Sequence, residues 1–226
     1  MRIGVISDLH ANLPALEAVL RDMPVVDLLI CCGDIIGYYP DPNEVCERIQ
    51  ATGALTVRGN HDAYVLGVLQ PSPQRRAAYR TDWTRERLTA GNLAWLAALP
   101  TERRIDIGNG ILILRHASPW DEETYLYPDS ERLSEIALSP DEILVIGHTH
   151  HPMRHQAGAG IIINPGSVGQ PRDWNPQAAY ATFDTASRQV VFHRVDYDVA
   201  GLQDRLRSLN WETPTIDILS RCKDGQ

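Results

Sequence analysis

The sequence predicts an α/β fold built around a parallel sheet. Over residues 1–60, strand-like and helix-like segments alternate, which is the pattern of βαβ units. The strand-like segments are nearly continuous apolar runs, as expected for strands that helices cover on both faces. Each run ends in polar residues, so reactive side chains are predicted to gather at the carboxyl edge of the sheet, where open α/β sheets bind ligands.

This first part of the chain accounts for three strands and two helices. The second helix has Asp41 at its cap position, Pro42 in its first turn and Glu44 where a capping box requires an acid. We expect strands over residues 3–7, 27–32 and 54–57, and helices over residues 12–22 and 41–51.

The middle of the chain is helical in pattern and the remainder is mostly β. An apolar stripe predicts helices over residues 73–99. We treat residues 68–99 as a candidate lid or helical insert within a single domain of residues 1–226. The turn at residues 108–110 joins two strands as a hairpin. The remaining strands are expected over residues 104–107, 111–114, 143–146, 161–163, 180–183 and 190–195, and helices over residues 131–137 and 199–209.

Charge limits the classes of partner. The formal net charge is -8 and the pI is near 5.4, which argues against binding of polymeric nucleic acid, because that needs a basic surface. A small phosphorylated ligand remains compatible, since bound cations outweigh a distant acidic surface. We expect no membrane association. A homo-oligomer is compatible with the sequence, although no segment indicates its interface.

The cysteines and the start of the chain bear on the compartment. The four cysteines, at 31, 32, 46 and 222, lack the spacing of a zinc site or a disulfide framework, and we expect them to be reduced. Cys31 and Cys32 are adjacent on a predicted strand, so their side chains should point to opposite faces. The first strand begins almost at Met1, which leaves no room for a signal peptide, so the expected location is cytoplasmic.

Clusters of polar residues follow the predicted strands at five places. Taken singly, each fits a simple role as a helix cap, a turn or an exposed strand end. Because every cluster lies just past an apolar strand, all would be delivered to one edge, and coincidence is the poorer explanation. The clusters are Asp8-Leu9-His10, Gly33-Asp34, Gly59-Asn60-His61-Asp62, His116 and Gly147-His148-Thr149-His150.

The order and spacing of these clusters closely resemble the calcineurin-like metallophosphoesterase family over most of the chain. Residues 34–43 and 164–172 further resemble its small single-domain bacterial and archaeal phosphodiesterase branch. The resemblance implies a two-sheet mixed β-sandwich flanked by helices, and hydrolysis of a phosphate ester by two metal ions. By motif, it implies that Asp8, His10 and His150 bind one metal, that Asn60, His116 and His148 bind the other, and that Asp34 bridges both.

The ligand types and the remaining histidine suggest the chemistry. Mixed imidazole and oxygen ligands suit divalent transition metals, with Mn expected and Fe, Zn or Ni as alternatives. Two such ions would clamp a phosphoryl group and activate a shared water as the nucleophile. The resemblance leaves His61 free of metal, and we interpret it as the general acid for the leaving oxygen. Asp62 either orients His61 or stabilises a helix start as an early-turn acid, and we favour the second role.

We interpret the protein as a phosphodiesterase acting on a small phosphodiester or a nucleotide. Residues 35–39 stand where the related serine/threonine phosphatases carry an arginine-bearing segment, so a phosphate-clamping arginine is missing there. The alternatives are a phosphomonoesterase or protein phosphatase, and a non-catalytic metal-binding scaffold. The complete ligand set and His61 argue against the scaffold.

Two loops offer candidate substrate contacts. Residues 118–128 follow His116 and supply either a stacking surface, through Trp120 or Tyr125, or a solvated rim. Arg172 is a further candidate contact.

Overall fold

Two five-stranded sheets packed face to face form the centre of the protein, and a computed structural model describes residues 1–223. Both sheets contain parallel and antiparallel neighbours, so the predicted mixed two-sheet sandwich is confirmed. The first sheet has the order β10 (Gln189–Val195), β9 (Ala178–Asp184), β1 (Arg2–Ile6), β2 (Leu28–Cys31) and β3 (Leu55–Thr56). The second has the order β4 (Glu102–Asp106), β5 (Ile111–Arg115), β6 (Glu142–Val145), β8 (Gly160–Asn164) and β7 (Met153–Ala157).

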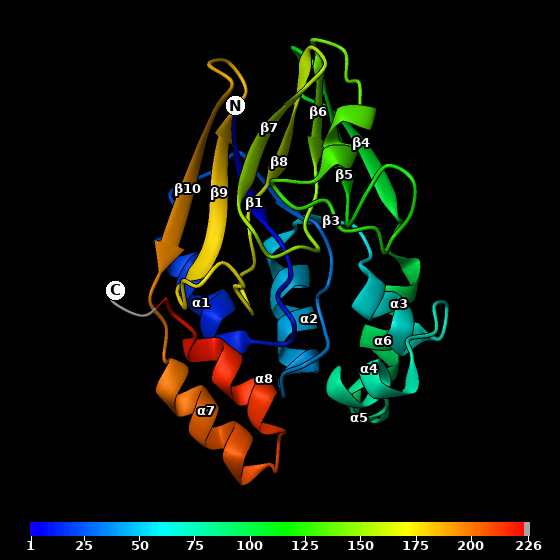
Figure 1. Ribbon diagram of the computed structural model, residues 1–226, viewed down its shortest axis with the longest axis vertical. Coiled ribbons are helices and arrows are strands. Elements are labelled where there is room, and N and C mark those ends of the chain that lie inside the picture. Colours follow the sequence, from blue (N-terminus) through cyan, green and yellow to red (C-terminus); the bar gives the residue numbers. More distant parts are fainter. Residues whose placement is uncertain (224–226) are drawn as a thin grey trace.

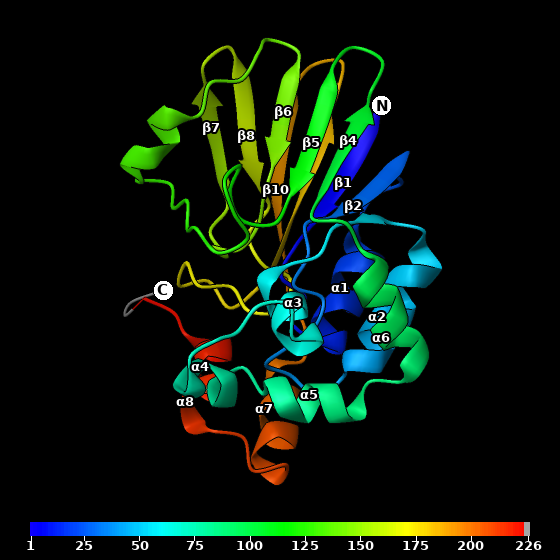
Figure 2. The same ribbon diagram turned by 90° about the vertical axis from the view of Figure 1, so that its right-hand side faces the viewer.

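The helices lie mainly at one end of the molecule, below the strands in Figures 1 and 2. Within residues 1–223, no helix is both long enough and apolar enough to cross a membrane. The helices are α1 (Leu13–Asp22), α2 (Pro42–Thr52), α3 (Asn60–Leu66), α4 (Pro73–Ala78), α5 (Thr81–Arg87), α6 (Ala90–Ala98), α7 (Val199–Ser208) and α8 (Thr213–Asp217), with short 3₁₀ turns η1 (Glu131–Glu135) and η2 (Ile218–Ser220).

Parallel pairing in both sheets determines where the loops meet. Strands β1, β2 and β3 are parallel neighbours, and so are β5, β6 and β8. The loops at their carboxyl ends are joined by backbone hydrogen bonds, from Gly147 to His116 (2.7 Å) and from Val168 to Ser7 (3.0 Å). The carboxyl ends of the two sheets therefore form one edge.

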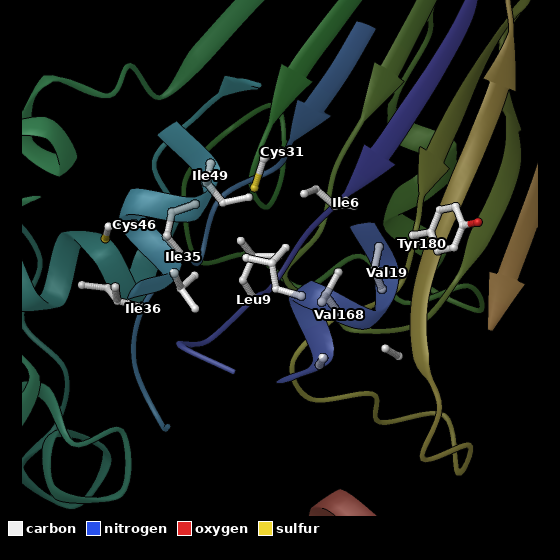
Figure 3. Close-up of a cluster of buried hydrophobic side chains, with 14 of the residues drawn as sticks. Ile6, Leu9, Val19, Cys31, Ile35, Ile36, Cys46, Ile49, Val168 and Tyr180 are labelled. Carbon is white, nitrogen blue, oxygen red and sulfur yellow. The ribbon is translucent and has the colours of Figure 1, made fainter. Parts of the chain in front are cut away.

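Two hydrophobic clusters hold the first sheet from its two sides. One packs Ile6 and Cys31 against helices α1 and α2 (Figure 3), and the other packs Cys32 against the second sheet. The prediction that helices cover both faces was wrong, because the second sheet covers one of them. The opposite orientation of Cys31 and Cys32 is confirmed.

The predicted elements differ from the structure mainly where segments are short. The stretch from 73 to 99 is divided into α4, α5 and α6, of which α5 and α6 pack against α2 and α3. Strand β7 and helix α8 were not predicted, and of helix α3 only the start near Asp62 was. The hairpin of β4 and β5 is confirmed.

The prediction that the Asp41 side chain caps helix α2 was wrong. Asp41 stands at the cap position but makes no side-chain cap bond. Its carboxylate instead lies 2.6 Å from Arg205 of α7. The reason is tertiary, because an arginine from the far end of the chain offers this carboxylate a charged partner.

Candidate metal centre

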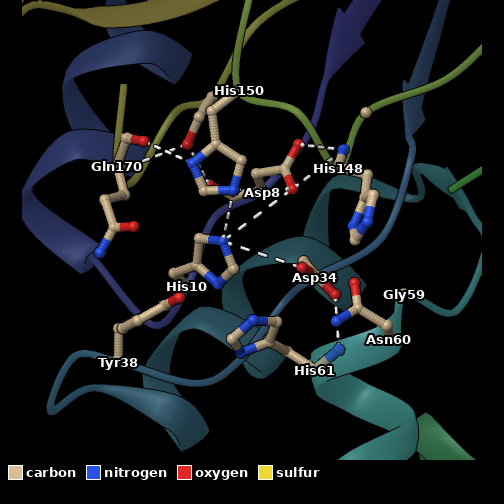
Figure 4. A network of polar contacts seen from close by, with 12 residues as sticks. Asp8, His10, Asp34, Tyr38, Gly59, Asn60, His61, His148, His150 and Gln170 are labelled. Atoms are coloured by element: carbon tan, nitrogen blue, oxygen red, sulfur yellow. Dashed lines mark hydrogen bonds and ion pairs between the residues drawn. The ribbon is translucent and has the colours of Figure 1, made fainter. Parts of the chain in front are cut away.

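The loops at the common edge bring all the predicted ligand residues together. Asp8, His10 and His150 form one group in which a donor atom of each lies within 4.8 Å of the others. Asp34, His116 and His148 form a second group by the same measure. Figure 4 shows Asp8 and Asp34 at the centre of this network, with His10, His61, His148 and His150 around them.

Asp34 lies between the two groups. Its Oδ2 atom is 3.8 Å from Nε2 of His10 in the first group and 3.3 Å from Nε2 of His116 in the second. Asn60 joins the second group, since its Oδ1 lies 2.9 Å from Nε2 of His116. In the first group, Nε2 of His150 lies 3.3 Å from Oδ1 of Asp8. This arrangement suits the bridging role that the family resemblance implies for Asp34.

The histidine rings are oriented as metal ligands require. Nδ1 of His116 faces the carbonyl of Cys32 at 2.8 Å, and Nδ1 of His150 faces the carbonyl of Gln170 at 2.5 Å. A ring that donates from Nδ1 keeps the Nε2 lone pair free for a cation. His148 has the opposite orientation, because its Nε2 faces the carbonyl of Glu123 at 3.0 Å. Its Nδ1 is therefore the atom whose lone pair is free for a cation.

Burial prepares most of the rings for metal binding. Desolvation lowers the pKa of His10 and His150 well below the usual value and that of His148 to about 3, so these rings are neutral near pH 7. Neutral imidazoles and carboxylates together are a donor set that fits divalent transition metals. The residues present therefore fit the metals that this fold implies.

The two carboxylates respond differently to burial. Desolvation raises the pKa of Asp8. Desolvation also acts against the charged form of Asp34, but His116 and other histidines outweigh it and hold that pKa well below its usual range. In return, the Asp34 carboxylate outweighs the burial of His116 and raises its pKa to about 9. In the metal-free protein, the His116 proton thus compensates the charge of Asp34.

The ligand residues carry backbone strain. Asp8, His10, Asp34, His148 and His150 all have positive φ angles, between 51° and 67°. Non-glycine residues rarely adopt this region, and such conformations cost about 1 to 3 kcal/mol each. Hydrogen bonds hold the strained turns, for example from the His148 amide to the Asp8 carboxylate at 3.1 Å. Strain concentrated at these positions is typical of a functional site.

Two glycines of the motifs lie so close to the ligand carboxylates that no side chain would fit there. A Cβ atom on Gly59 would lie 2.1 Å from Oδ1 of Asp34. A Cβ atom on Gly147 would lie 2.6 Å from Oδ2 of Asp8 and 1.9 Å from Oγ of Ser7. Each ligand carboxylate therefore needs a glycine of another loop beside it.

His61 fills no place in the two metal groups that the resemblance implies, but by the same 4.8 Å measure it forms a third group with His10 and Asp34. Its buried ring packs against His10 (4.8 Å between centroids) and Tyr79 (4.2 Å), and its amide donates to Oδ1 of Asp34. Burial lowers its pKa to about 3. Asp62 does not orient this ring; its carboxylate accepts the Gly59 amide at the start of α3, as the helix-start interpretation predicted.

The rim contains one of the two aromatic residues proposed as a stacking surface. Tyr125 stacks on the His148 ring at 3.9 Å, whereas Trp120 is 42% exposed and packs under Arg132. Sequence reasoning missed Tyr38, whose ring lies 4.8 Å from both His10 and His61. It also missed Gln170, which orients His150. Tyr38 and Gln170 lie within the two segments that carried the family resemblance, which was their only signal.

Comparisons with known proteins place the chain in a family. The family model of the calcineurin-like phosphoesterase superfamily domain matches residues 1–188. The chain belongs to this superfamily. An uncharacterized protein of Methanocaldococcus jannaschii, MJ0912, is 34% identical over 90% of this chain and 91% of its own length. The phosphodiesterase YfcE of Escherichia coli is 29% identical over 84% of this chain and 91% of its own length.

Solved structures agree with this assignment. A metallophosphoesterase from Sphaerobacter thermophilus has a TM-score of 0.83 at 34% identity and covers 98% of this chain and 99% of its own. The protein is thus a phosphoric ester hydrolase of a metal-dependent family. Its structure provides groups of residues suited to hold metal.

Proposed function

We propose that the protein is a dinuclear phosphodiesterase that hydrolyses a small phosphodiester or a nucleotide. The observation that carries this proposal is the position of Asp34, whose carboxylate is within 4 Å of histidines of both groups. A carboxylate placed in this way suits two ions held side by side. The similarity to a phosphodiesterase, YfcE, supports the diester as substrate.

The residues divide into two ligand sets and one proton donor. Asp8, His10 and His150 would hold one ion, Asn60, His116 and His148 the other, and Asp34 both, with Mn as the expected metal. When bound, two divalent ions would polarise the phosphoryl group and lower the pKa of a water nucleophile. The net charge of -8 supports a small substrate over a polymeric nucleic acid. We also propose a cytoplasmic location, which the four free cysteines support.

His61 would donate the proton that the leaving oxygen requires. Its low pKa in the free protein reflects burial and the neighbouring cation of Arg172. A phosphoryl anion bound beside the ring favours the imidazolium. Binding of the substrate therefore promotes the protonated state that general acid catalysis needs.

Hydrolysis of model esters tests this function. Metal-stripped protein is assayed with and without Mn²⁺ on bis-p-nitrophenyl phosphate, a diester, and on p-nitrophenyl phosphate, a monoester. We expect Mn²⁺ to restore turnover, with the diester preferred. A monoester preference would favour the phosphomonoesterase alternative. Mn²⁺ binding without turnover of either ester, or of a panel of nucleotides and cyclic nucleotides, would favour the scaffold.

Replacement of His61 tests the general acid. His61→Gln should lower kcat about 100-fold or more for a diester with a poor leaving group, with its Mn content unchanged. The loss should be smaller for a p-nitrophenyl ester, because that leaving group needs little protonation. An equal loss for both leaving groups would contradict the assignment.

A further inference from the structure

Arg172 lies beside the metal centre and has only neutral hydrogen-bond acceptors. It is partly buried in the loop after β8. Its Nη2 donates to the Tyr38 hydroxyl at 3.0 Å and to Oε1 of Gln170 at 2.7 Å, and its Nε donates to the same Oε1 at 3.1 Å. Within residues 1–223, its Nη1 makes no hydrogen bond and no carboxylate lies within ion-pair distance.

Two other partly buried arginines of the protein are paired with acids, whereas Arg103 donates to the backbone carbonyl of Thr56. Arg58 lies 3.3 Å from Glu122, and Arg115 lies 3.5 Å from Glu102. A guanidinium withdrawn from water is costly unless it has such a partner. Arg172 keeps an uncompensated charge, and its two acceptors orient it without neutralising it. A site of this kind is suited to receive an anion.

The two acceptors of Arg172 also connect it to the metal centre. The Tyr38 ring packs edge-on against His10, with 4.8 Å between centroids. The backbone carbonyl of Gln170 faces Nδ1 of His150 at 2.5 Å. Burial lowers the pKa of His150 most, and the positive charge of Arg172 lowers it further. The guanidinium thus stands on the side of the centre that holds His10 and His150.

We propose that Arg172 binds a non-bridging oxygen of the phosphoryl group that is being hydrolysed. This inference rests on the proposed function, because it assumes that a phosphoryl group occupies the centre. The segment after Asp34 has no arginine and places Tyr38 there instead. The Tyr38 hydroxyl accepts a hydrogen bond from Arg172, which lies in the loop after β8. The cation that is missing from the segment after Asp34 is therefore supplied by that loop.

Binding of inorganic phosphate tests this role directly. We would titrate Mn²⁺-loaded protein with phosphate by calorimetry, for wild type and for Arg172→Gln. Loss of a charged hydrogen bond should weaken phosphate binding about tenfold or more, with Mn content unchanged. The matched control is Arg154→Gln, an exposed arginine of β7, which should bind phosphate as the wild type does.

A second variant tests the charge while leaving the arginine in place. Gln170→Glu puts a carboxylate at the atom that now accepts from Nη2 at 2.7 Å. It should neutralise Arg172 and weaken phosphate binding by about tenfold. If Arg172→Gln loses its metal, Gln170→Glu decides the question. Wild-type phosphate affinity in either variant with full metal content would overturn the inference.

The outcomes separate this inference from the proposed function. Wild-type protein that hydrolyses no ester but binds phosphate through Arg172 would contradict the function alone. Protein that hydrolyses diesters, with a phosphate affinity that does not depend on Arg172, would contradict the inference alone.

Discussion

Individual residues of the metal centre are held in states that they would not adopt in an unfolded chain. Five ligand residues have left-handed backbone angles, and most of the histidines are neutral through burial. His116 is the exception, since Asp34 outweighs its burial and raises its pKa to about 9. The metal-free protein therefore retains a proton where the resemblance places a metal.

This proton should make the stability of the metal-free protein depend on pH. An unfolded histidine has a pKa of about 6.5, so the folded state binds the proton more tightly. The resulting stabilisation is fully present below about pH 6.5 and is lost as the pH rises through about 9. The Tm of metal-stripped protein should fall across this window, as measured by circular dichroism.

The metal and one substitution provide the controls. Mn²⁺-loaded protein should show a smaller fall, because the metal replaces the proton. His116→Gln lacks the titrating ring and should also show a smaller fall. An equal fall in the wild type and in His116→Gln would show that another group is responsible.

At the scale of elements, short loops and a short helix position the ligands. Helix α3 begins at Asn60, and Asp62 in its first turn joins two loops. The Asp62 carboxylate accepts amides from Gly59 (2.9 Å), Ile35 (3.0 Å) and Ile36 (3.2 Å). It thereby fixes the segment after Asp34 against the segment that carries Asn60.

Replacement of Asp62 should destabilise this junction in proportion to the bonds lost. Asp62→Ala leaves three buried amides without an acceptor, which should cost about 3 kcal/mol or more. Asp62→Asn keeps one acceptor oxygen for Ile35 and Ile36 and should cost only about 1 kcal/mol. Urea unfolding measures both values. Equal costs for the two variants would show that the amides do not depend on this carboxylate.

At the scale of the whole molecule, the C-terminal segment completes the site. Residues 189–223 lie beyond the match to the family, yet they contact the segment after Asp34. The Trp211 indole donates to the Tyr38 carbonyl at 2.5 Å, and Arg221 donates to the Arg172 carbonyl at 2.9 Å. The C-terminal segment therefore holds the backbone of both Arg172, the proposed phosphate contact, and Tyr38, which accepts its hydrogen bond.

The sandwich also determines which thiols are accessible. Cys31, Cys32 and Cys46 are buried and free, and burial raises the pKa of each thiol, whereas the free Cys222 is exposed. A thiolate is needed for reaction with Ellman's reagent. We expect one fast-reacting thiol in the native protein and the remaining three only after unfolding, without reductant.

The matched variant is Cys222→Ser, which should lose the fast reaction and keep the slow one. Fewer than four reactive thiols in unfolded, unreduced wild-type protein would reveal a disulfide and contradict the prediction.

The sequence by itself determined the α/β class, most strands, the family resemblance and the residues that gather at the centre. It could do so because apolar runs define buried strands, and a polar residue at the end of a parallel strand is delivered to a known edge. It left out β7, α8 and all of α3 beyond its start, because these segments are too short or too polar to produce a clear period.

Only the tertiary structure decided which partners these residues have. The second sheet, rather than helices, covers one face of the first. The carboxylate of Asp41 pairs with Arg205 instead of capping helix α2. The low pKa of His61 and the placement of Arg172 against Tyr38 likewise depend on residues distant in sequence. Burial and charge act through space, so they are fixed only when the chain has folded.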